Sequence, residues 1–308
     1  MAERDSLLRA VIDKPQDDAP RLVYADWLDE HGEADHAELI RLQCALACCE
    51  ERPEHDRAEA SRRVDELLGR PGFGWVACDG SELEWDRGFV AEYPLAFEGD
   101  RGSGRITCHG RNGLARMLPR VLSIKLSLTD WLGDTRPQRP HLNRPWPRPI
   151  TNLSFILAWP SAPVVRSLAH LPWCNGVTKL CCVKSGIPVE AFADLILSPH
   201  LARLEVIYAD GVCLAGTPPR AVDELDDPQV VAAWQRILCS PCARKLRVLQ
   251  LGGIGLQLAL AIADSPHLDN LKYLELFESG WYPASVQQRL QERFGQVWRP
   301  VRHGYQSS

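Results

Sequence analysis

The stretch from 21 to 43, RLVYADWLDEHGEADHAELIRLQ, contains residues suited to binding a metal or transferring protons. His31 and His36 stand among several carboxylates, and imidazole and carboxylate groups are common zinc ligands. A helical zinc site usually presents two histidines four residues apart on one face, whereas these two lie on either side of a predicted turn. Runs of acidic residues on a helix are commonly a solvated face. The spacing therefore favours a structural pair of helices over a metal site.

Cys239 and Cys242 form the only CxxC pair in the chain. A structural zinc site would need a second CxxC or a pair of histidines downstream, and neither is present. We therefore expect these cysteines to pack in the core. His200 and His267 follow the same Ser-Pro dipeptide in two places, which indicates a role in a turn.

The motifs of common enzyme classes are absent from the sequence. There is no GxSxG, no GxxxxGK, no HExxH and no dinucleotide-binding glycine pattern. We therefore expect a protein that is not an enzyme and has no cofactor. The alternative is an enzyme or metal-dependent regulator that uses the cysteines and the acidic stretch.

Composition narrows the class of protein further. The chain has 308 residues, of which 45% are hydrophobic, enough for a substantial core in one or two domains. Its formal charge of −5 gives no electrostatic case for binding nucleic acid. The 11 cysteines are odd in number, and the charged amino terminus does not resemble an export signal, so we expect reduced thiols and a cytoplasmic location. The most apolar stretch, 248–263, is shorter than the roughly 20 residues that span a bilayer, so no membrane segment is expected.

Two helices must position the acidic stretch, one at about 18–31 and one at about 34–50. Asp17 and Asp18 are candidate caps of the first helix, and Gly32 ends it. The short turn predicts that the two helices pair antiparallel. We expect Asp26 to pair with Arg41 across this hairpin, and Asp26→Ala to cost more stability than Asp29→Ala. A further helix is expected at 53–70, and two short strands are expected near Gly80 and Gly88.

This hairpin resembles a known bacterial family. The segments YADWLDEHG and AELIRLQ, within residues 5 to 50, resemble the repeat-companion domain, a short module often found ahead of leucine-rich repeats. The matching residues are Tyr24, Asp26, Trp27, Leu28, Gly32, Glu38, Ile40, Arg41, Leu42 and Gln43. The family has no established activity, so the resemblance implies an architecture and leaves the function open.

A six-residue pattern with three apolar positions recurs from residue 121 onward. It reads VLSIKL at 121, ITNLSF at 150, VTKLCC at 177, LARLEV at 201, LRVLQL at 246 and LKYLEL at 271. Most intervals between these starts are those of leucine-rich repeats, with one insertion. Prolines that precede the strands end helix-like runs, so each repeat is expected to be strand, turn, helix and turn.

These features predict an α/β fold, in which an amino-terminal helical hairpin module precedes an irregular leucine-rich-repeat solenoid with a parallel sheet. Leu180, Leu204, Leu249 and Leu274 are expected to form one apolar ladder. The expected divisions are the module (1–70), a strand and helix transition that caps the solenoid (71–120), the repeats with a carboxyl-terminal cap (121–298) and a tail (299–308). The final helix and strand, 283–298, close the far end.

The expected function is a scaffold that binds a protein partner on the concave face of the repeats. Side chains between the ladder positions point to that face, because residues alternate across a strand. The candidate contact residues are Lys125, Ser154, Ile156, Lys179, Arg203, Glu205, Gln250, Tyr273, Glu275 and Phe277. The Pro- and Arg-rich loop at 136–149 and the insertion at 211–235 are further candidate contacts. In another interpretation, the chain is a structural part of a larger complex and the hairpin does the docking.

Overall fold

The computed structural model describes residues 2–48, 54–70, 73, 83, 85–99, 106–109, 121–129, 132–133, 146, 148–156, 158–183, 185–210, 227–276 and 282–300. Contacts between residues divide the chain into two units. The amino-terminal unit comprises 1–96, 109–125 and 147–149, and the carboxyl-terminal unit comprises 97–108, 126–146 and 150–308.

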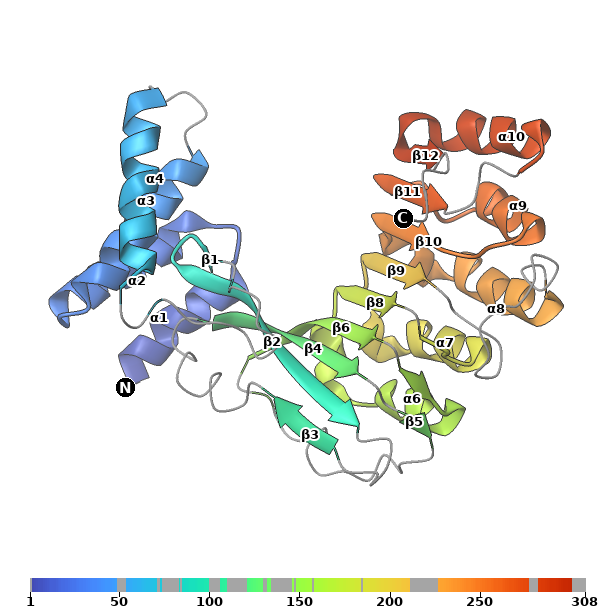
Figure 1. Cartoon of the computed structure of the whole chain (residues 1–308), viewed down its shortest axis with the longest axis horizontal. Helices are drawn as coiled ribbons and strands as arrows, with labels where there is room; N and C mark the ends of the chain where they lie inside the picture. Colours follow the sequence, from blue (N-terminus) through green and yellow to red (C-terminus); the bar gives the residue numbers. More distant parts are fainter. Residues whose placement is uncertain are drawn as a thin grey trace, which may run out of the picture. The chain divides into compact units, whose positions relative to one another are not determined.

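Four helices begin the amino-terminal unit (Figure 1): α1 (Ala2–Asp13), α2 (Asp18–Glu30), α3 (Ala34–Cys48) and α4 (Glu54–Leu68). The predictions for 18–31, 34–50 and 53–70 are therefore confirmed to within two residues. The side chain of Asp17 caps α2 by accepting a hydrogen bond from the Ala19 amide (3.0 Å). Gly32 follows the helix with φ +79°, a backbone angle that glycine adopts without strain. The sequence analysis made no prediction for α1.

The apolar sides of α1, α2 and α3 share a core, whose buried residues include Leu8, Val11, Tyr24, Leu28, Ile40 and Phe89. Helix α4 packs in a second cluster, in which Val64 and Leu67 join Leu39 and Phe73. On the outside, Arg41 pairs with both Asp26 (2.8 Å) and Asp29 (2.5 Å). The predicted pair of Asp26 and Arg41 is therefore confirmed, but Asp29 is an equal second partner.

Strands follow the helices. The bounds are β1 (Trp85–Asp86), β2 (Phe89–Gly99), β3 (Ile106–His109), β4 (Val121–Thr129), β5 (Leu132–Gly133), β6 (Ile150–Ile156), β7 (Trp159–Pro160), β8 (Lys179–Val183), β9 (Val206–Asp210), β10 (Val248–Leu251), β11 (Tyr273–Leu276) and β12 (Trp298–Pro300). The main sheet has the order β1-β2-β4-β6-β8-β9-β10-β11-β12, with β3 beside β2, and β5 pairs separately with β7. The turn at Gly88 joins the antiparallel strands β1 and β2, as predicted, whereas Gly80 lies outside the described residues.

In the carboxyl-terminal unit the main-sheet strands β6, β8, β9, β10, β11 and β12 are parallel, and each pairs with the next strand in this series. Their apolar residues lie in register as the predicted ladder requires, with one exception. The central row contains Leu153, Leu180, Ile207, Leu249, Leu274 and Trp298. Ile207 takes the place predicted for Leu204, which is buried three residues earlier. The fold is thus mixed α/β with a mostly parallel sheet and an amino-terminal helical part.

The error at Leu204 has a physical reason in the sequence. Two sets of residues fit the apolar pattern: Leu201-Leu204-Val206 and Leu204-Ile207-Ala209. Only the second has its central residue in strand β9, which is Val206–Asp210. A proline stands eight residues before the central position of four strands: Pro172 and Leu180, Pro199 and Ile207, Pro241 and Leu249, and Pro266 and Leu274. These prolines come after a helix and help to end it, because proline cannot continue a helical hydrogen-bond ladder.

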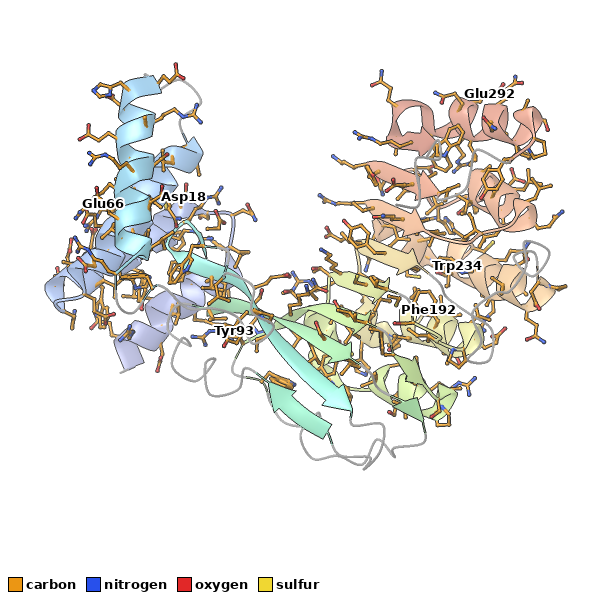
Figure 2. All side chains as sticks on the ribbon, in the orientation of Figure 1. Asp18, Glu66, Tyr93, Phe192, Trp234 and Glu292 are labelled. Atoms are coloured by element: carbon orange, nitrogen blue, oxygen red, sulfur yellow. The ribbon has the colours of Figure 1, made fainter. Side chains whose placement is uncertain are left out.

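Helices cover one side of strands β6–β12 (Figure 1): α6 (Ala162–Leu168), α7 (Val189–Ile196), α8 (Pro228–Leu238), α9 (Leu256–Asp264) and α10 (Ala284–Phe294). Between these helices and the sheet lies an apolar core. Phe192 of α7 and Trp234 of α8 are both buried there (Figure 2), with ring centroids 5.7 Å apart. None of the described helices is both long and apolar enough to cross a membrane.

Two buried serines tie neighbouring helices together. Ser198, after α7, donates a hydrogen bond to the Ala169 carbonyl after α6, and Ser265, after α9, donates to the Leu238 carbonyl at the end of α8 (2.8 Å). The last carbonyls of a helix have no partner within the helix, so these hydroxyls satisfy groups that burial would otherwise leave unpaired.

The helix and strand predicted for 283–298 are present: α10 is followed by β12, which pairs with β11. Helix α8 begins within the insertion at 211–235, while 211–226 and most of the loop at 136–149 lie outside the described residues. His200 and His267 both lie in turns, as predicted. His200 Nδ1 is 3.1 Å from the Asn175 side chain, and His267 Nδ1 accepts from Arg244 (3.1 Å).

Candidate functional site

The side of the sheet opposite the helices carries two rows of side chains across β8–β12. We call this surface the helix-free face, and define it by Lys179, Cys181, Val206, Tyr208, Val248, Gln250, Tyr273, Glu275 and Arg299. Lys179, Val206, Val248 and Tyr273 form one row, and Cys181, Tyr208, Gln250, Glu275 and Arg299 form the other. Arg299 is exposed and the others are half-buried, whereas the intervening rows are buried core.

Tyrosines and cations pair on this face. Lys179 Nζ lies 5.0 Å from the ring centroid of Tyr208, and the Arg299 guanidinium lies 5.3 Å from that of Tyr273. The Tyr273 hydroxyl donates to Glu275 (2.8 Å). Burial and this hydrogen bond both raise the pKa of Tyr273, so its phenol stays protonated at neutral pH and remains a donor.

Further charged residues lie just before strands β9, β10 and β11 in the chain. Glu205, Arg247 and Lys272 each stand one residue before a strand, and Arg203 stands three residues before β9. Arg247 pairs with Glu205 (3.4 Å). We call Arg203, Glu205, Arg247 and Lys272 the strand-entry charges. Together with the helix-free face they offer aromatic surface, hydrogen-bond donors and cations.

Only some of the predicted contact residues lie on the helix-free face. Lys179, Gln250, Tyr273 and Glu275 lie on the helix-free face as expected. Arg203 and Glu205 are not on strand β9, because the strand begins later than predicted. Val206 and Tyr208 occupy those positions on the face instead. The eight-residue spacing from Pro199 was the signal that could have identified Tyr208.

The remaining predicted contact residues are buried, half-buried or outside the described part of the carboxyl-terminal unit. Ser154 is only 1% exposed and donates to the Asn152 side chain (3.2 Å), so the expectation that it lies on an accessible face is wrong. Ile156 is half-buried at the end of β6. Lys125 is half-buried in β4 and belongs to the amino-terminal unit. Phe277 lies outside the described residues.

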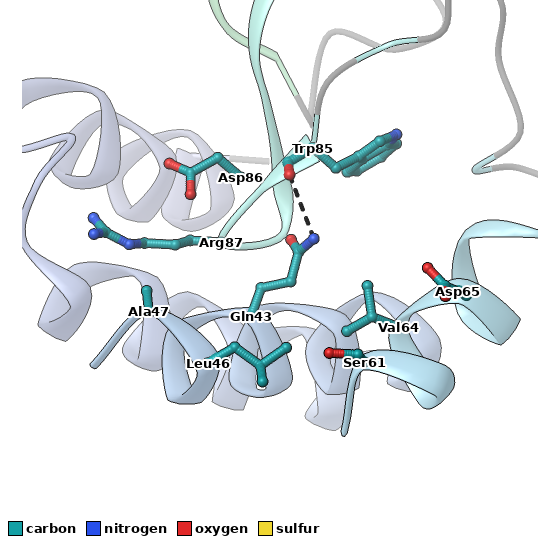
Figure 3. Close-up of a pocket in the computed structure, with 9 residues that line it drawn as sticks. All are labelled: Gln43, Leu46, Ala47, Ser61, Val64, Asp65, Trp85, Asp86 and Arg87. Carbon is teal, nitrogen blue, oxygen red and sulfur yellow. Dashed lines mark hydrogen bonds between the residues drawn. The ribbon is translucent and has the colours of Figure 1, made fainter. Parts of the chain in front are cut away.

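A second candidate site is a hollow of about 360 Å³ in the amino-terminal unit. Figure 3 shows its lining residues: Gln43, Leu46, Ala47, Ser61, Val64, Asp65, Trp85, Asp86 and Arg87. Leu46, Ala47 and Val64 provide apolar surface, while Asp65, Asp86 and Arg87 provide charges of both signs. Sequence analysis missed this hollow, because its residues come from three separate segments.

The turn beside the hollow is held by three residues of α3, two of which belong to the AELIRLQ segment. Gln43 accepts from the Gly88 amide (2.6 Å) and donates to the Trp85 carbonyl (3.4 Å; Figure 3). His36, which is 1% exposed, donates from Nε2 to the Gly88 carbonyl (2.8 Å). Ile40 lies directly against Gly88. These residues therefore dock the β1–β2 turn onto α3.

A buried arginine supports the same turn. Arg21 is 1% exposed, donates to the Pro15 carbonyl (2.6 Å), and places its guanidinium 5.4 Å from the ring centroid of Phe89. Burial lowers the pKa of Arg21, but an arginine remains charged at neutral pH. Asp18 is its nearest carboxylate, at 3.9 Å.

The groups considered for metal binding have other partners. His31 donates from Nδ1 to the Trp27 carbonyl (2.7 Å), and the ring of His36 donates to the Gly88 carbonyl. Within the described ranges, no group of three or more His, Cys, Asp or Glu side chains is arranged to hold a metal ion.

The cysteines differ in exposure. Cys239 is exposed, so the prediction that it packs in the core is wrong, and Cys242 is half-buried beside Ser240. Cys239 is the C-cap of α8 and follows the buried residues Ile237 and Leu238, so it falls on the exposed side of the helix. By contrast, burial raises the pKa of Cys44 and of Cys174 to about 12, so both stay as thiols. This favours packing over reactivity for these two residues.

Comparison with protein-family models, with curated proteins and with solved structures finds no match to this chain.

Proposed function

We propose that this chain is a non-enzymatic scaffold that binds a protein partner on the helix-free face. In this proposal, strands β6–β12 with α6–α10 are an irregular leucine-rich-repeat solenoid, and α1–α4 are a helical module like the repeat-companion domain. The in-register apolar rows, the parallel strands joined in chain order and the helices on one side support the architecture.

One observation carries the function. Five neighbouring strands present half-buried tyrosines and charged groups in two aligned rows, with no described helix over them. Tyrosine and arginine are enriched at the centres of protein interfaces, because they combine apolar area with hydrogen-bond donors. The chemistry of this face is recognition, since its described residues include no paired nucleophile and base of the kind that covalent catalysis needs.

The experiment compares capture of partners by the full chain and by two variants. Immobilised wild-type protein is mixed with lysate of the source cells, and bound proteins are quantified by mass spectrometry. Tyr208→Ala/Tyr273→Ala should lose the proteins that the wild type enriches. Trp173→Ala removes a half-buried aromatic in the turn Pro172–Gly176, which is outside the strands that form this face, and should retain them. Equal capture by all three proteins would contradict the proposal.

A further inference from the structure

The charges on and beside the helix-free face are unbalanced. Five cations (Lys179, Arg203, Arg247, Lys272 and Arg299) accompany two carboxylates (Glu205 and Glu275) among the described side chains. Their net charge is +3, although the whole chain carries −5. A local excess of positive charge on an acidic protein attracts a negatively charged partner.

Most of these cations also lack a carboxylate partner within the described part of the unit. Arg247 pairs with Glu205, and Glu275 accepts from Tyr273, so both carboxylates are already engaged. No ion pair or hydrogen bond from the side chains of Lys179, Arg203, Lys272 or Arg299 to a described residue is found. Two of them, Lys179 and Arg299, stack on tyrosine rings, and no described residue accepts a hydrogen bond from their N–H groups.

The helix side of the same unit is different. Arg166 and Arg236 share Asp194, Arg289 pairs with Asp264, and Arg293 pairs with Asp269. Arg236 also pairs with Glu190 (2.5 Å). The described arginines of α6, α8 and α10 are therefore neutralised internally, whereas the cations of the opposite side are not. This contrast directs an anionic partner to the helix-free face.

We infer that the partner of this face is an acidic peptide segment of another protein. This inference rests on the proposed function and specifies the partner's chemistry. From β8 to β12 there are four strand spacings, which amount to about 19 Å, the length of about six extended residues. A peptide of that length reaches from Lys179 to Arg299. Its carboxylates accept from these cations and from Arg203 and Lys272, while Val206 and Val248 provide apolar contact between them.

A second copy of this chain is the competing occupant, because residues 1–70 contain 18 Asp and Glu against 10 Lys and Arg. Many of those acids are already paired within their own unit: Asp26 and Asp29 with Arg41, Glu38 with Arg63, and Asp35 with Arg70. The acidic segment of a different protein is therefore the better match.

The test measures binding of fluorescein-labelled decaglutamate to the full chain by fluorescence anisotropy. Lys179→Glu/Arg299→Glu is compared with Lys14→Glu/Arg57→Glu, a control that makes the same change in net charge at two exposed residues of the amino-terminal unit that form no ion pair with a described residue. We expect the wild type and the control to bind, the face variant to bind about tenfold more weakly, and added salt to weaken binding. If the face variant unfolds by circular dichroism, Lys179→Gln/Arg299→Gln replaces it.

Three results would overturn the inference. These are no binding of decaglutamate by the wild type, an equal loss in both double variants, or tighter binding of a ten-residue oligothymidylate than of decaglutamate. Sedimentation showing self-association that Lys179→Glu/Arg299→Glu abolishes would assign the face to a second copy instead. Loss of protein capture in Tyr208→Ala/Tyr273→Ala without any decaglutamate binding would refute the acidic partner and leave the scaffold proposal standing.

Discussion

Gly88 shows how one residue couples a turn to a helix. It adopts φ +81°, and a Cβ atom built there would lie 2.1 Å from Ile40 Cγ1 and 2.7 Å from Ile40 Cα. A side chain would therefore strain the backbone and collide with α3. The sequence identified Gly88 as a turn, but its contact with Ile40 depends on the tertiary structure.

We predict that Gly88→Ala lowers the free energy of unfolding by about 3 kcal/mol or more, from backbone strain and overpacking together. Gly32→Ala is the matched control, because Gly32 has φ +79° and nothing within 4 Å of the added Cβ. It should cost about 1 kcal/mol, from backbone strain alone. Urea unfolding of both variants measures the difference, and equal costs would show that the contact with Ile40 is unimportant.

The ion pairs of Arg41 revise an expectation from the sequence. Asp26 and Asp29 both contact its guanidinium, and the Asp26 side chain is 71% exposed while that of Asp29 is 41% exposed. Exposed ion pairs contribute little because water screens them. Asp26→Ala and Asp29→Ala should each cost less than about 1 kcal/mol and differ little from one another. Denaturant unfolding tests this, and a clearly larger loss in Asp26→Ala would restore the original expectation.

At the scale of elements, the strands β8–β11 show which part of the pattern can be predicted from sequence. Their apolar residues alternate with half-exposed ones, so the strands and the buried row could be predicted. The register of β9 could not be predicted from apolar residues alone, because Leu204 and Ile207 both fit. Burial of Ser154 also had no local signal, since it depends on packing from outside its strand.

In the amino-terminal unit, the helices could be predicted from sequence, whereas the contacts between distant segments could not. Helix bounds follow from caps and periodicity, which are local, so 18–31 and 34–50 were predicted closely. The hollow around Trp85 and the roles of His36 and Gln43 were not predicted, because these contacts join residues more than 40 positions apart. Their hydrogen bonds explain physically why those residue types suit these two positions of α3.

We predict that Leu249→Ala costs about 2 to 5 kcal/mol, because Leu249 is fully buried between Ile207 and Leu274. Val248→Ala is the control in the same strand: Val248 is half-buried on the helix-free face and should cost about 1 kcal/mol or less. Thermal and urea unfolding measure both variants. A loss in Val248→Ala as large as in Leu249→Ala would contradict the assignment of the two faces.

At the scale of the whole molecule, stability should fall in acid. A hydrogen bond from Arg63 lowers the pKa of Glu38. Burial alone would raise the pKa of Asp194, but hydrogen bonds from Arg166 and Arg236 outweigh it and lower that pKa. A carboxylate with a lowered pKa stabilises the folded state above the pKa of the unfolded chain, about 4, and loses this contribution as the pH falls through its folded-state pKa.

The corresponding measurement is urea unfolding of the wild type and of Arg63→Met at pH 7 and at pH 3. Arg63→Met should be less stable at pH 7, and the difference should shrink at pH 3, where Glu38 is increasingly protonated in both proteins. Arg57→Met, which removes an exposed and unpaired arginine from the same helix, should show no such dependence. A difference that persists unchanged at pH 3 would mean that Arg63 acts through packing.

Strands β6, β8, β9, β10, β11 and β12 pair in the order in which they occur along the chain, and this order has a kinetic consequence. Each strand finds its neighbour after a short excursion, so the chain can nucleate at any adjacent pair and extend in either direction. The longest connection is the one between β9 and β10. Measured between corresponding positions just before the strands, it spans 42 residues from Leu204 to Leu246, whereas the connection from Val177 to Leu204 spans 27 residues. Closing a loop costs only about 0.6 kcal/mol more for each doubling of its length. Extra residues can therefore be inserted between two neighbouring strands at a small cost in folding free energy, and the adjacent strands need not change their pairing to accommodate them.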